Sequence, residues 1–391
     1  MIRKLTTAMA ITAFSALSLN AFGYTPLSFR ISPIQNQAAS LQSAAPLAQK
    51  AEAFKNWGLW NSSKDGKALV PSHIHAPEAW KLEEGNRTVV VAVIDTGIDA
   101  GHPDLKENLW SDPKEKSVYG WNFITNSANP GDEHGHGTHV AGIIGAVTNP
   151  IAGISGVAKH VSIMPVKYYS DAAPPSLNVK NSALAIEWAV NHGAQIINYS
   201  GGGPEFSEEE YLAIKKAEAA GVLIVAAAGN ERQDIDMVSN YYYPASYGLS
   251  NIISVAGIDI DNNLFKSSNW GKRKVDVAAP GEKIYSTFPI NKGKYGYMTG
   301  TSQATPFVAG LAALLLSKNP KLTPAQIKTI IRSTVDQIPN LNSKIGSGGK
   351  INAYTALLAL INGSSPVFAK GPDLVLNQKS FNLSDTLSLA Q

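Results

Sequence analysis

The sequence predicts an α/β fold in which a mainly parallel β-sheet carries helices on both faces. Two observations lead to this prediction. Short apolar runs rich in valine and isoleucine recur along the chain, and such runs are typical of strands buried on both faces. Longer segments with helical periodicity separate them, and this alternation favours parallel strands joined by right-handed helical crossovers.

Each expected element follows from one of these two patterns. The expected strands are residues 88–96, 162–169, 195–200, 222–230 and 251–257. The expected helices are residues 178–193, 208–221, 302–318, 323–335 and 352–361. Thr323 stands where a helix N-cap is favoured, and Gly221 stands where a C-cap is favoured. Because functional side chains of parallel sheets gather at the carboxyl ends of the strands, the residues that end these runs are the first candidates for a site.

The composition divides the chain into four parts. Residues 1–23 begin with two basic residues, continue with an apolar stretch and end in small residues, which is the layout of a secretory signal peptide; an ordinary first helix is the simpler alternative. Residues 24–56, rich in alanine, glutamine and serine, are expected to form a leader or short prosegment. Residues 57–363 are expected to form the compact domain, followed at 364–391 by a tail to which no pattern assigns a role. We therefore expect a secreted protein, extracellular or periplasmic.

Charge and composition exclude several classes of function. The chain has 391 residues and a formal net charge of +3 without basic runs, so nothing in it resembles the electrostatic footprint of a protein that binds nucleic acid or an anionic membrane surface. It contains no cysteine, which excludes disulfides, thiolate catalysis and cysteine-ligated metals. Beyond the first 23 residues, no uninterrupted apolar stretch of about 18 residues predicts a membrane span.

A serine between small residues raises the first question about function. Ser302 lies in the stretch GTSQATPFVAG, residues 300–310, at the start of a long apolar helical pattern. Serine is a favoured N-cap residue, so capping alone would explain it. A nucleophilic serine would need a base, a group that orients the base, and donors for an oxyanion. On this stretch alone both interpretations stay open.

Two other segments supply candidate partners for Ser302. Asp95 ends a buried apolar run, where a carboxylate is costly unless it is hydrogen-bonded; an aspartate that only caps the next turn is the alternative. The stretch DEHGHGTHVAG contains His134, His136 and His139, which at this spacing could also ligate zinc. The HExxH arrangement is absent, however, and no cysteine is available to complete a tetrahedral site.

Taken together, the three motifs DTGID, HGTHVAG and GTSxATPxVAG resemble those of the subtilisin-like serine peptidases, the subtilase family, over roughly residues 57–361. The order Asp, His, Ser is also that family's order. The resemblance implies that Asp95 orients His136 and that His136 is the base for Ser302. It further implies that Asn230, in VAAAGNE, completes an oxyanion hole with the backbone N–H of Ser302.

The resemblance also implies binding sites outside the triad. Ser200, Gly201 and Gly202, in NYSGGG, match the segment that pairs with a peptide main chain and lines the first specificity pocket; a plain glycine loop is the alternative. A structural calcium ion is expected as well, with Asp104 of HPDL and Asn149 of VTNPIAGISG as ligands, because hard oxygen donors suit Ca²⁺.

Several features depart from the family pattern. Gln303 stands where the family usually has methionine, Phe307 stands where it usually has histidine, and Pro150 interrupts the expected calcium loop. The leader is shorter than the family's usual folded prodomain, which argues against self-maturation by that route. None of these positions belongs to the expected triad.

The sequence thus predicts a monomeric, secreted serine endopeptidase that hydrolyses peptide bonds in proteins or peptides through an acyl-enzyme. One alternative is a catalytically silent, subtilase-like binding protein. Another is a lipase or esterase of the α/β-hydrolase type, but that class needs a GxSxG motif and places Ser before Asp before His. In this chain the serine comes last, after Asp95 and His136.

Overall fold

A computed structural model of the protein describes residues 54–61 and 70–363. The expected signal peptide, most of the expected leader and the expected tail lie outside the described residues. Within them, none of the helices is long and apolar enough to cross a membrane. The packed part already includes Phe54, whose ring meets that of Trp80 edge to face at 5.6 Å between centroids.

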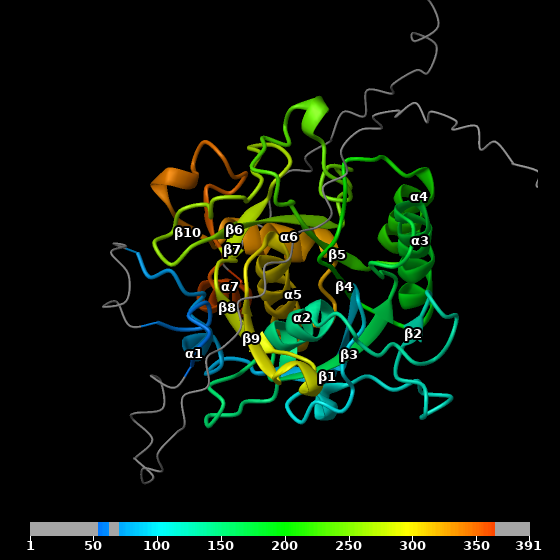
Figure 1. Ribbon diagram of the computed structural model, residues 1–391. Coiled ribbons are helices and arrows are strands. Elements are labelled where there is room, and N and C mark those ends of the chain that lie inside the picture. Colours follow the sequence, from blue (N-terminus) through cyan, green and yellow to red (C-terminus); the bar gives the residue numbers. More distant parts are fainter. Residues whose placement is uncertain (1–53, 62–69, 364–391) are drawn as a thin grey trace, which may run out of the picture. The chain divides into compact units, whose positions relative to one another are not determined.

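One sheet organises the described part of the chain (Figure 1). Its order is β10-β11-β7-β6-β5-β4-β1-β3-β2, and every neighbouring pair is parallel except β10 and β11. The strands are β1 (Gly85–Asp95), β2 (Trp121–Asn122), β3 (His160–Lys167), β4 (Ile196–Tyr199), β5 (Leu223–Ala227), β6 (Ile252–Ile258), β7 (Val277–Pro280), β10 (Asp336–Gln337) and β11 (Gly349–Lys350). A separate antiparallel hairpin consists of β8 (Ile284–Thr287) and β9 (Tyr295–Met298).

Helices cover both faces of this sheet, so the predicted fold class is confirmed. The α-helices are α1 (Ala76–Ala79), α2 (His136–Gly145), α3 (Pro175–Asn191), α4 (Glu208–Ala219), α5 (Thr301–Lys318), α6 (Pro324–Ser333) and α7 (Ala353–Ile361). The 3₁₀ turns are η2 (Lys106–Asn108), η3 (Val238–Asn240), η4 (Ile290–Lys292) and η5 (Pro339–Leu341). Helices α2 and α5 share one core, and α3 and α4 share the core of the opposite face.

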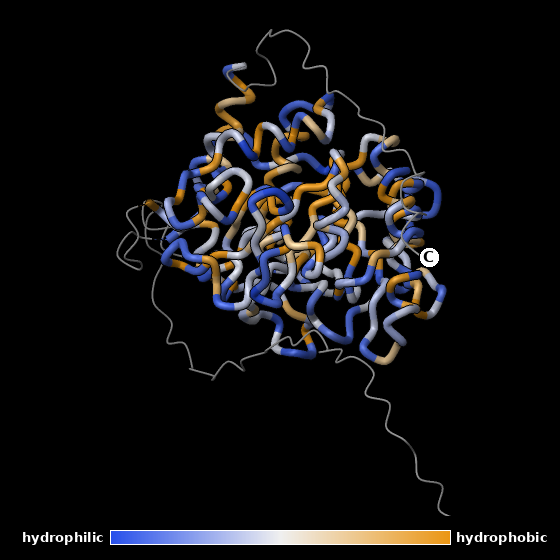
Figure 2. Tube along the Cα trace, turned by 90° about the horizontal axis from the view of Figure 1, so that it is seen from above, coloured by the Kyte–Doolittle hydropathy of each residue, from blue (hydrophilic) through white to orange (hydrophobic). Residues whose placement is uncertain are grey.

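Alternate side chains of the central strands enter the two cores. In β1, Val91 and Val93 belong to the core of α2 and α5, whereas Ala92 and Ile94 belong to the core of α3 and α4. Successive side chains of a strand point to opposite faces, and here both faces are buried. This explains why the strand is a continuous apolar run, and Figure 2 shows such hydrophobic segments running through the interior.

Helix α5 is the central element of its core. All residues from Thr301 to Leu316 are buried, so the helix is apolar on every side because it is packed on every side. It contains Pro306, which has no N–H to donate to the carbonyl of Ser302 four residues earlier. That carbonyl therefore needs a donor from elsewhere.

The observed boundaries differ from the predicted ones where loops begin. The predicted run 222–230 is a strand only as far as Ala227, because the chain turns at Gly229, whose φ is +100°. Helix α6 has Thr323 as its N-cap with a full capping box to Gln326, as its sequence suggested, but it ends at Ser333. Strand β2 and strands β7 to β11 were not predicted.

Candidate active site

Three adjacent strands deliver the expected site residues to one edge of the sheet. The strands lie in the order β5-β4-β1; Asp95 is the last residue of β1, and Ser200 follows β4 directly. Asn230 comes three residues after the end of β5. Helix α2 begins with His136, and Ser302 is the second residue of α5. Parallel strands thus bring together residues that lie far apart in the sequence.

Asp95 and His136 form a buried pair. The imidazole Nδ1 lies 2.7 Å from Asp95 Oδ1, and both side chains are 3% exposed. The same carboxylate oxygen accepts the backbone N–H of Thr96 at 2.7 Å. An Nδ1–H that donates to a carboxylate fixes the tautomer, so Nε2 is the basic nitrogen of this ring.

Ser302 is bonded to the segment that follows β4. Its hydroxyl donates to the Ser200 carbonyl at 2.8 Å, and the Ser200 hydroxyl donates to the Ser302 carbonyl at 2.9 Å. The second bond supplies the donor that Pro306 cannot provide. Of the two interpretations that the sequence leaves open for Ser302, the helix cap is wrong: the N-cap of α5 is Gly300, without a side-chain bond.

The Asn230 side chain has a defined orientation. Its Oδ1 accepts the backbone N–H of Thr301 at 2.9 Å and is 3.3 Å from the Thr301 hydroxyl oxygen. The Thr301 hydroxyl in turn accepts the N–H of Gly229 at 3.1 Å. With Oδ1 held in this way, Nδ2 is the end of the amide that is left to donate to another group. Asn230 is half-buried, beside the start of α5.

The two glycines after Ser200 are required by close packing. A Cβ on Gly201 would lie 2.2 Å from the Tyr168 hydroxyl oxygen, and one on Gly202 would lie 2.3 Å from the Tyr243 carbonyl oxygen. Gly202 also has a φ of +150°. Side chains other than hydrogen therefore do not fit at either position.

The three histidines around α2 point to different partners and do not converge on a metal. His139 is fully buried, with Nε2 3.0 Å from the Ile284 carbonyl and 3.3 Å from that of Gly296. Burial, together with the charge of His136, lowers the pKa of His139 to about 3. His134 faces Asp171 at 3.7 Å. No group of three or more histidines and carboxylates able to hold a metal occurs among the described residues.

The two expected calcium ligands lie side by side, but they are hydrogen-bonded to each other. Asp104 Oδ1 accepts from Asn149 Nδ2 at 3.1 Å, and Asp104 Oδ2 accepts from the Tyr295 hydroxyl at 2.5 Å. The side-chain amide oxygen of Asn149, Oδ1, accepts the N–H of Ala152 at 3.2 Å. Burial, followed by the bond to Asp104, raises the pKa of Tyr295.

This arrangement does not fit the expected calcium site. Ca²⁺ takes six to eight oxygen ligands that face a common centre. The loop carbonyls of Asn149, Gly153 and Ile154 accept backbone N–H groups at 3.0 Å, and the Asn149 amide directs its nitrogen, not its oxygen, at Asp104. These carbonyl and carboxylate oxygens therefore accept hydrogen bonds from the protein itself. The bonds directly connect the three segments that carry Asp104, Asn149 and Tyr295.

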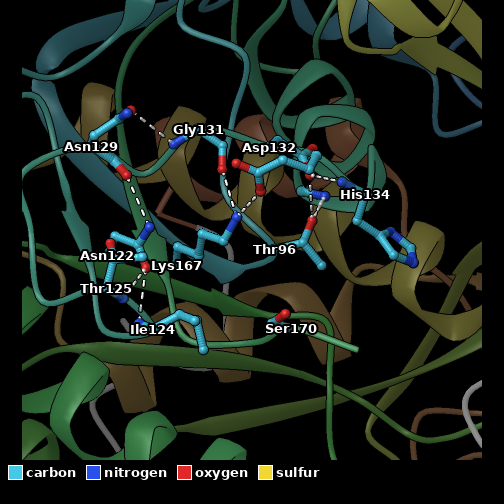
Figure 3. A network of polar contacts seen from close by, with 12 residues as sticks. Thr96, Asn122, Ile124, Thr125, Asn129, Gly131, Asp132, His134, Lys167 and Ser170 are labelled. Atoms are coloured by element: carbon cyan, nitrogen blue, oxygen red, sulfur yellow. Dashed lines mark hydrogen bonds and ion pairs between the residues drawn. The ribbon is translucent and has the colours of Figure 1, made fainter. Parts of the chain in front are cut away.

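Three polar residues near the Asp95–His136 pair were not predicted from the sequence: Thr96, Asp132 and Lys167. Figure 3 shows polar contacts of these three residues. Thr96 is the second residue of DTGID and Asp132 is the first of DEHGHGTHVAG, and both are buried. Lys167 ends a buried apolar strand, as Asp95 does. A charged residue at that position was the signal that could have identified it.

Comparisons with known proteins agree with the fold and the motifs. A model of the subtilase family matches residues 86–348. Thermitase from Thermoactinomyces vulgaris is 38% identical over 287 residues, which cover 73% of this chain and 94% of that protein. Subtilisin DY from Bacillus licheniformis is 38% identical over 250 residues, which cover 64% of this chain and 84% of that protein.

Two solved structures share the architecture. A protease from Pseudoalteromonas arctica PAMC 21717 superposes with a TM-score of 0.65 at 28% identity, covering 80% of this chain and 99% of that one. A cold-adapted subtilisin-like serine proteinase superposes with a TM-score of 0.56 at 32% identity, covering 68% and 87%. The chain therefore belongs to the subtilase family and is a subtilisin-like serine protease.

Proposed function

We propose that the protein is a secreted endopeptidase that cleaves protein or peptide substrates through an acyl-enzyme, with Asp95, His136 and Ser302 as its triad. The observation that carries the proposal is the buried 2.7 Å bond between Asp95 and His136, at the strand edge where α5 also begins. A buried carboxylate that fixes the tautomer of a histidine is what a general base for a serine requires.

Each group has a chemical role in this proposal. Asp95 accepts the Nδ1 proton and stabilises the imidazolium, while His136 Nε2 takes the proton of the Ser302 hydroxyl as its oxygen attacks the substrate carbonyl. The same proton then goes to the leaving amine, and water repeats the sequence to release the acyl group. For this reaction the Ser302 hydroxyl must turn its proton from the Ser200 carbonyl toward the base.

Two donors are available for the oxyanion. One is Asn230 Nδ2, which is oriented because Thr301 holds the amide oxygen. The other is the backbone N–H of Ser302, since the first four N–H groups of an α-helix have no acceptor within the helix. The positive end of α5 favours the same negative charge.

The substrate main chain would run beside Ser200, Gly201 and Gly202. The absence of side chains at the two glycines permits close approach of a peptide backbone. Secretion is proposed from the signal-like residues 1–23 alone.

A labelling experiment tests the triad directly. The purified protein is treated with a fluorophosphonate, which phosphonylates activated serines, and the tryptic peptide that contains residue 302 is sought by mass spectrometry. We expect the label on Ser302, and casein hydrolysis that falls about a million-fold in Ser302→Ala because members of a triad act as a unit. Unlabelled, inactive wild-type protein would support the silent binding protein instead.

A further inference from the structure

We propose that Lys167 is a positioning residue for His136, because its ammonium group fixes the loop of residues 129–135 that sets the start of α2. The inference rests on the proposed triad. Lys167 does not touch the reacting atoms in this proposal and acts only through the placement of the histidine.

Lys167 lies beside the Asp95–His136 pair. It is the last residue of β3 and is paired in register with Asp95, the last residue of β1. The side chain is 8% exposed, and a lysine at such a position is costly unless its N–H groups are bonded. Its Nζ donates to the Gly131 carbonyl at 2.8 Å and contacts the Glu133 carboxylate (Figure 3).

Of the two partners, the Gly131 carbonyl is the more important. The Glu133 side chain is 82% exposed, and ion pairs in contact with water contribute little. Gly131 lies in the loop pressed against the backbone that follows Asp95: a Cβ on Gly97 would be 2.5 Å from the Gly131 carbonyl oxygen and 2.4 Å from that of Pro130. The lysine therefore holds this loop down on the end of β1.

Asp132, the next residue, connects this loop to the start of α2 through hydrogen bonds. Its two oxygens accept the N–H groups of His134, Gly135 and Thr138 at 2.8–3.0 Å. They also accept the hydroxyls of Thr96 at 2.9 Å and Thr138 at 2.6 Å. Because the N-cap of α2 is Gly135, which has no side chain, Asp132 supplies the anionic cap that the helix start otherwise lacks.

Thr96 connects this cap to both members of the pair. Its hydroxyl accepts the N–H of Gly137 at 2.9 Å and donates to Asp132, while its own N–H donates to Asp95. The residues that follow Asp95 and His136 in the chain are thus bonded to each other. A shift of the loop would move the histidine against the aspartate, and misplacement by about 1 Å can lower a rate about 100-fold.

A second buried lysine provides a matched control. Lys350, in β11 near the opposite end of the sheet, is fully buried and donates to the His73 carbonyl at 2.7 Å and to Asp336 at 2.6 Å. It makes the same kinds of bond as Lys167, but none with the candidate active site. Its loss tests what removing a buried lysine does to the fold alone.

The experiment compares Lys167→Met, Lys167→Arg and Lys350→Met in the full chain. Steady-state kinetics on a peptide substrate are normalised to the fraction of Ser302 that fluorophosphonate labels, and melting temperatures are recorded in parallel. We expect Lys167→Met to lower kcat at least about 10-fold with KM nearly unchanged, since orientation and not binding is lost. Lys167→Arg should restore most of kcat, and Lys350→Met should lower the melting temperature without changing kcat.

The results separate the role of Lys167 from the proposed function as a whole. A Lys167→Met protein with wild-type kcat, or an equal loss of kcat in Lys350→Met, would overturn the inference while leaving the triad intact. A wild-type protein that neither hydrolyses peptides nor takes the label would overturn the proposed function and the inference with it. If Lys167→Met does not fold, Lys167→Gln, whose amide is one bond shorter and polar, takes its place with the same expected split between kcat and KM.

Discussion

Ser200 and Ser302 exchange two hydrogen bonds, each hydroxyl donating to the other residue's carbonyl, at 2.8 and 2.9 Å. The Ser302 carbonyl can take part because Pro306 does not donate to it within α5. The proline of the motif thus couples the proposed nucleophile to the proposed substrate-binding segment.

Ser200→Ala should lower the free energy of unfolding by about 1–3 kcal/mol, because a buried carbonyl loses its donor. Adding Pro306→Ala should recover much of this loss, since the alanine introduced there has a backbone N–H for the Ser302 carbonyl. Urea unfolding of the two single variants and the double variant measures the coupling. Strictly additive effects would contradict the proposed exchange of donors.

Asn230→Ala should lower kcat about 100- to 1,000-fold with little change in KM, because an oxyanion donor acts mainly in the transition state. Thr301→Val, which removes the hydroxyl between Gly229 and Asn230 but keeps the N–H that holds the amide, is the matched control and should have a smaller effect. The measurement is steady-state hydrolysis of a peptide amide. If KM rises and kcat does not fall, Asn230 binds substrate and is not an oxyanion donor.

Acid should destabilise the protein in the window from about pH 6.5 down to pH 3. The pKa of buried His139 is lowered to about 3, so between these values the unfolded chain binds a proton that the folded chain does not. Each such histidine contributes a loss of up to about 1.4 kcal/mol per pH unit, and burial also lowers the pKa of His73 to about 3. Unfolding free energies of wild type and His139→Gln are measured from pH 7 to pH 4. The two curves should converge toward low pH, because only the wild type loses the contribution of His139. Parallel curves would contradict the lowered pKa of His139 as the cause.

Tyr295→Phe should destabilise the protein by about 1–3 kcal/mol, because Asp104 loses a donor in a half-buried place. Tyr297→Phe, on the same strand with a 38% exposed side chain, is the control. A chelator should leave the melting temperature of wild type unchanged, since protein groups occupy the oxygens of Asp104. A chelator-induced drop that calcium reverses in wild type but that is absent in Asp104→Ala would show that Asp104 takes part in binding an ion, and would contradict this prediction.

Gln303→Met should make the enzyme more sensitive to peroxide. Gln303 is fully buried beside Ser302, and a sulfoxide formed there would be larger and more polar than the thioether it replaces. Met298, 3% exposed, has its sulfur 3.8 Å from Gln303 Nε2, so it is the alternative target. Residual activity after timed exposure, with mass spectrometry to locate the added oxygen, checks the prediction; equal rates for wild type and variant would refute it.

The five central strands were predictable because each carries an apolar run with valine or isoleucine that is buried on both faces. Strands β2, β10 and β11 were not, since they have only two residues each. Strand β7 was not because its sequence, VAAP, contains two alanines and a proline, which are depleted in strands. The β8–β9 hairpin was missed because its pattern depends on packing against α2, where Ser286 and Thr287 donate to the carbonyls of His139 and Thr138.

The sequence predicted the pairing of Asp95 with His136, but not the groups that hold these two residues in place. The roles of Asp132 and Lys167 depend mainly on backbone groups of residues 131–138, and a loop conformation of this kind has no sequence pattern of its own. Asp104, Asn149 and Tyr295 show the opposite case. The resemblance predicted that the first two residues lie together, and they do, but the bond from Tyr295 helps to satisfy the Asp104 carboxylate without an ion.

The central position of α5 has a consequence for the order in which the protein is made. The helix packs against strands that precede it in the chain, β1, β4, β5 and β6. Until it has been synthesised, the core that it shares with α2 is incomplete, and much of that face of the sheet lacks its cover. A nascent chain that ends before residue 301 therefore exposes apolar surface and should not complete its fold. Because Ser302 stands in the first turn of that same helix, a cell that produces this protein would not hold a folded intermediate that still lacks the proposed nucleophile.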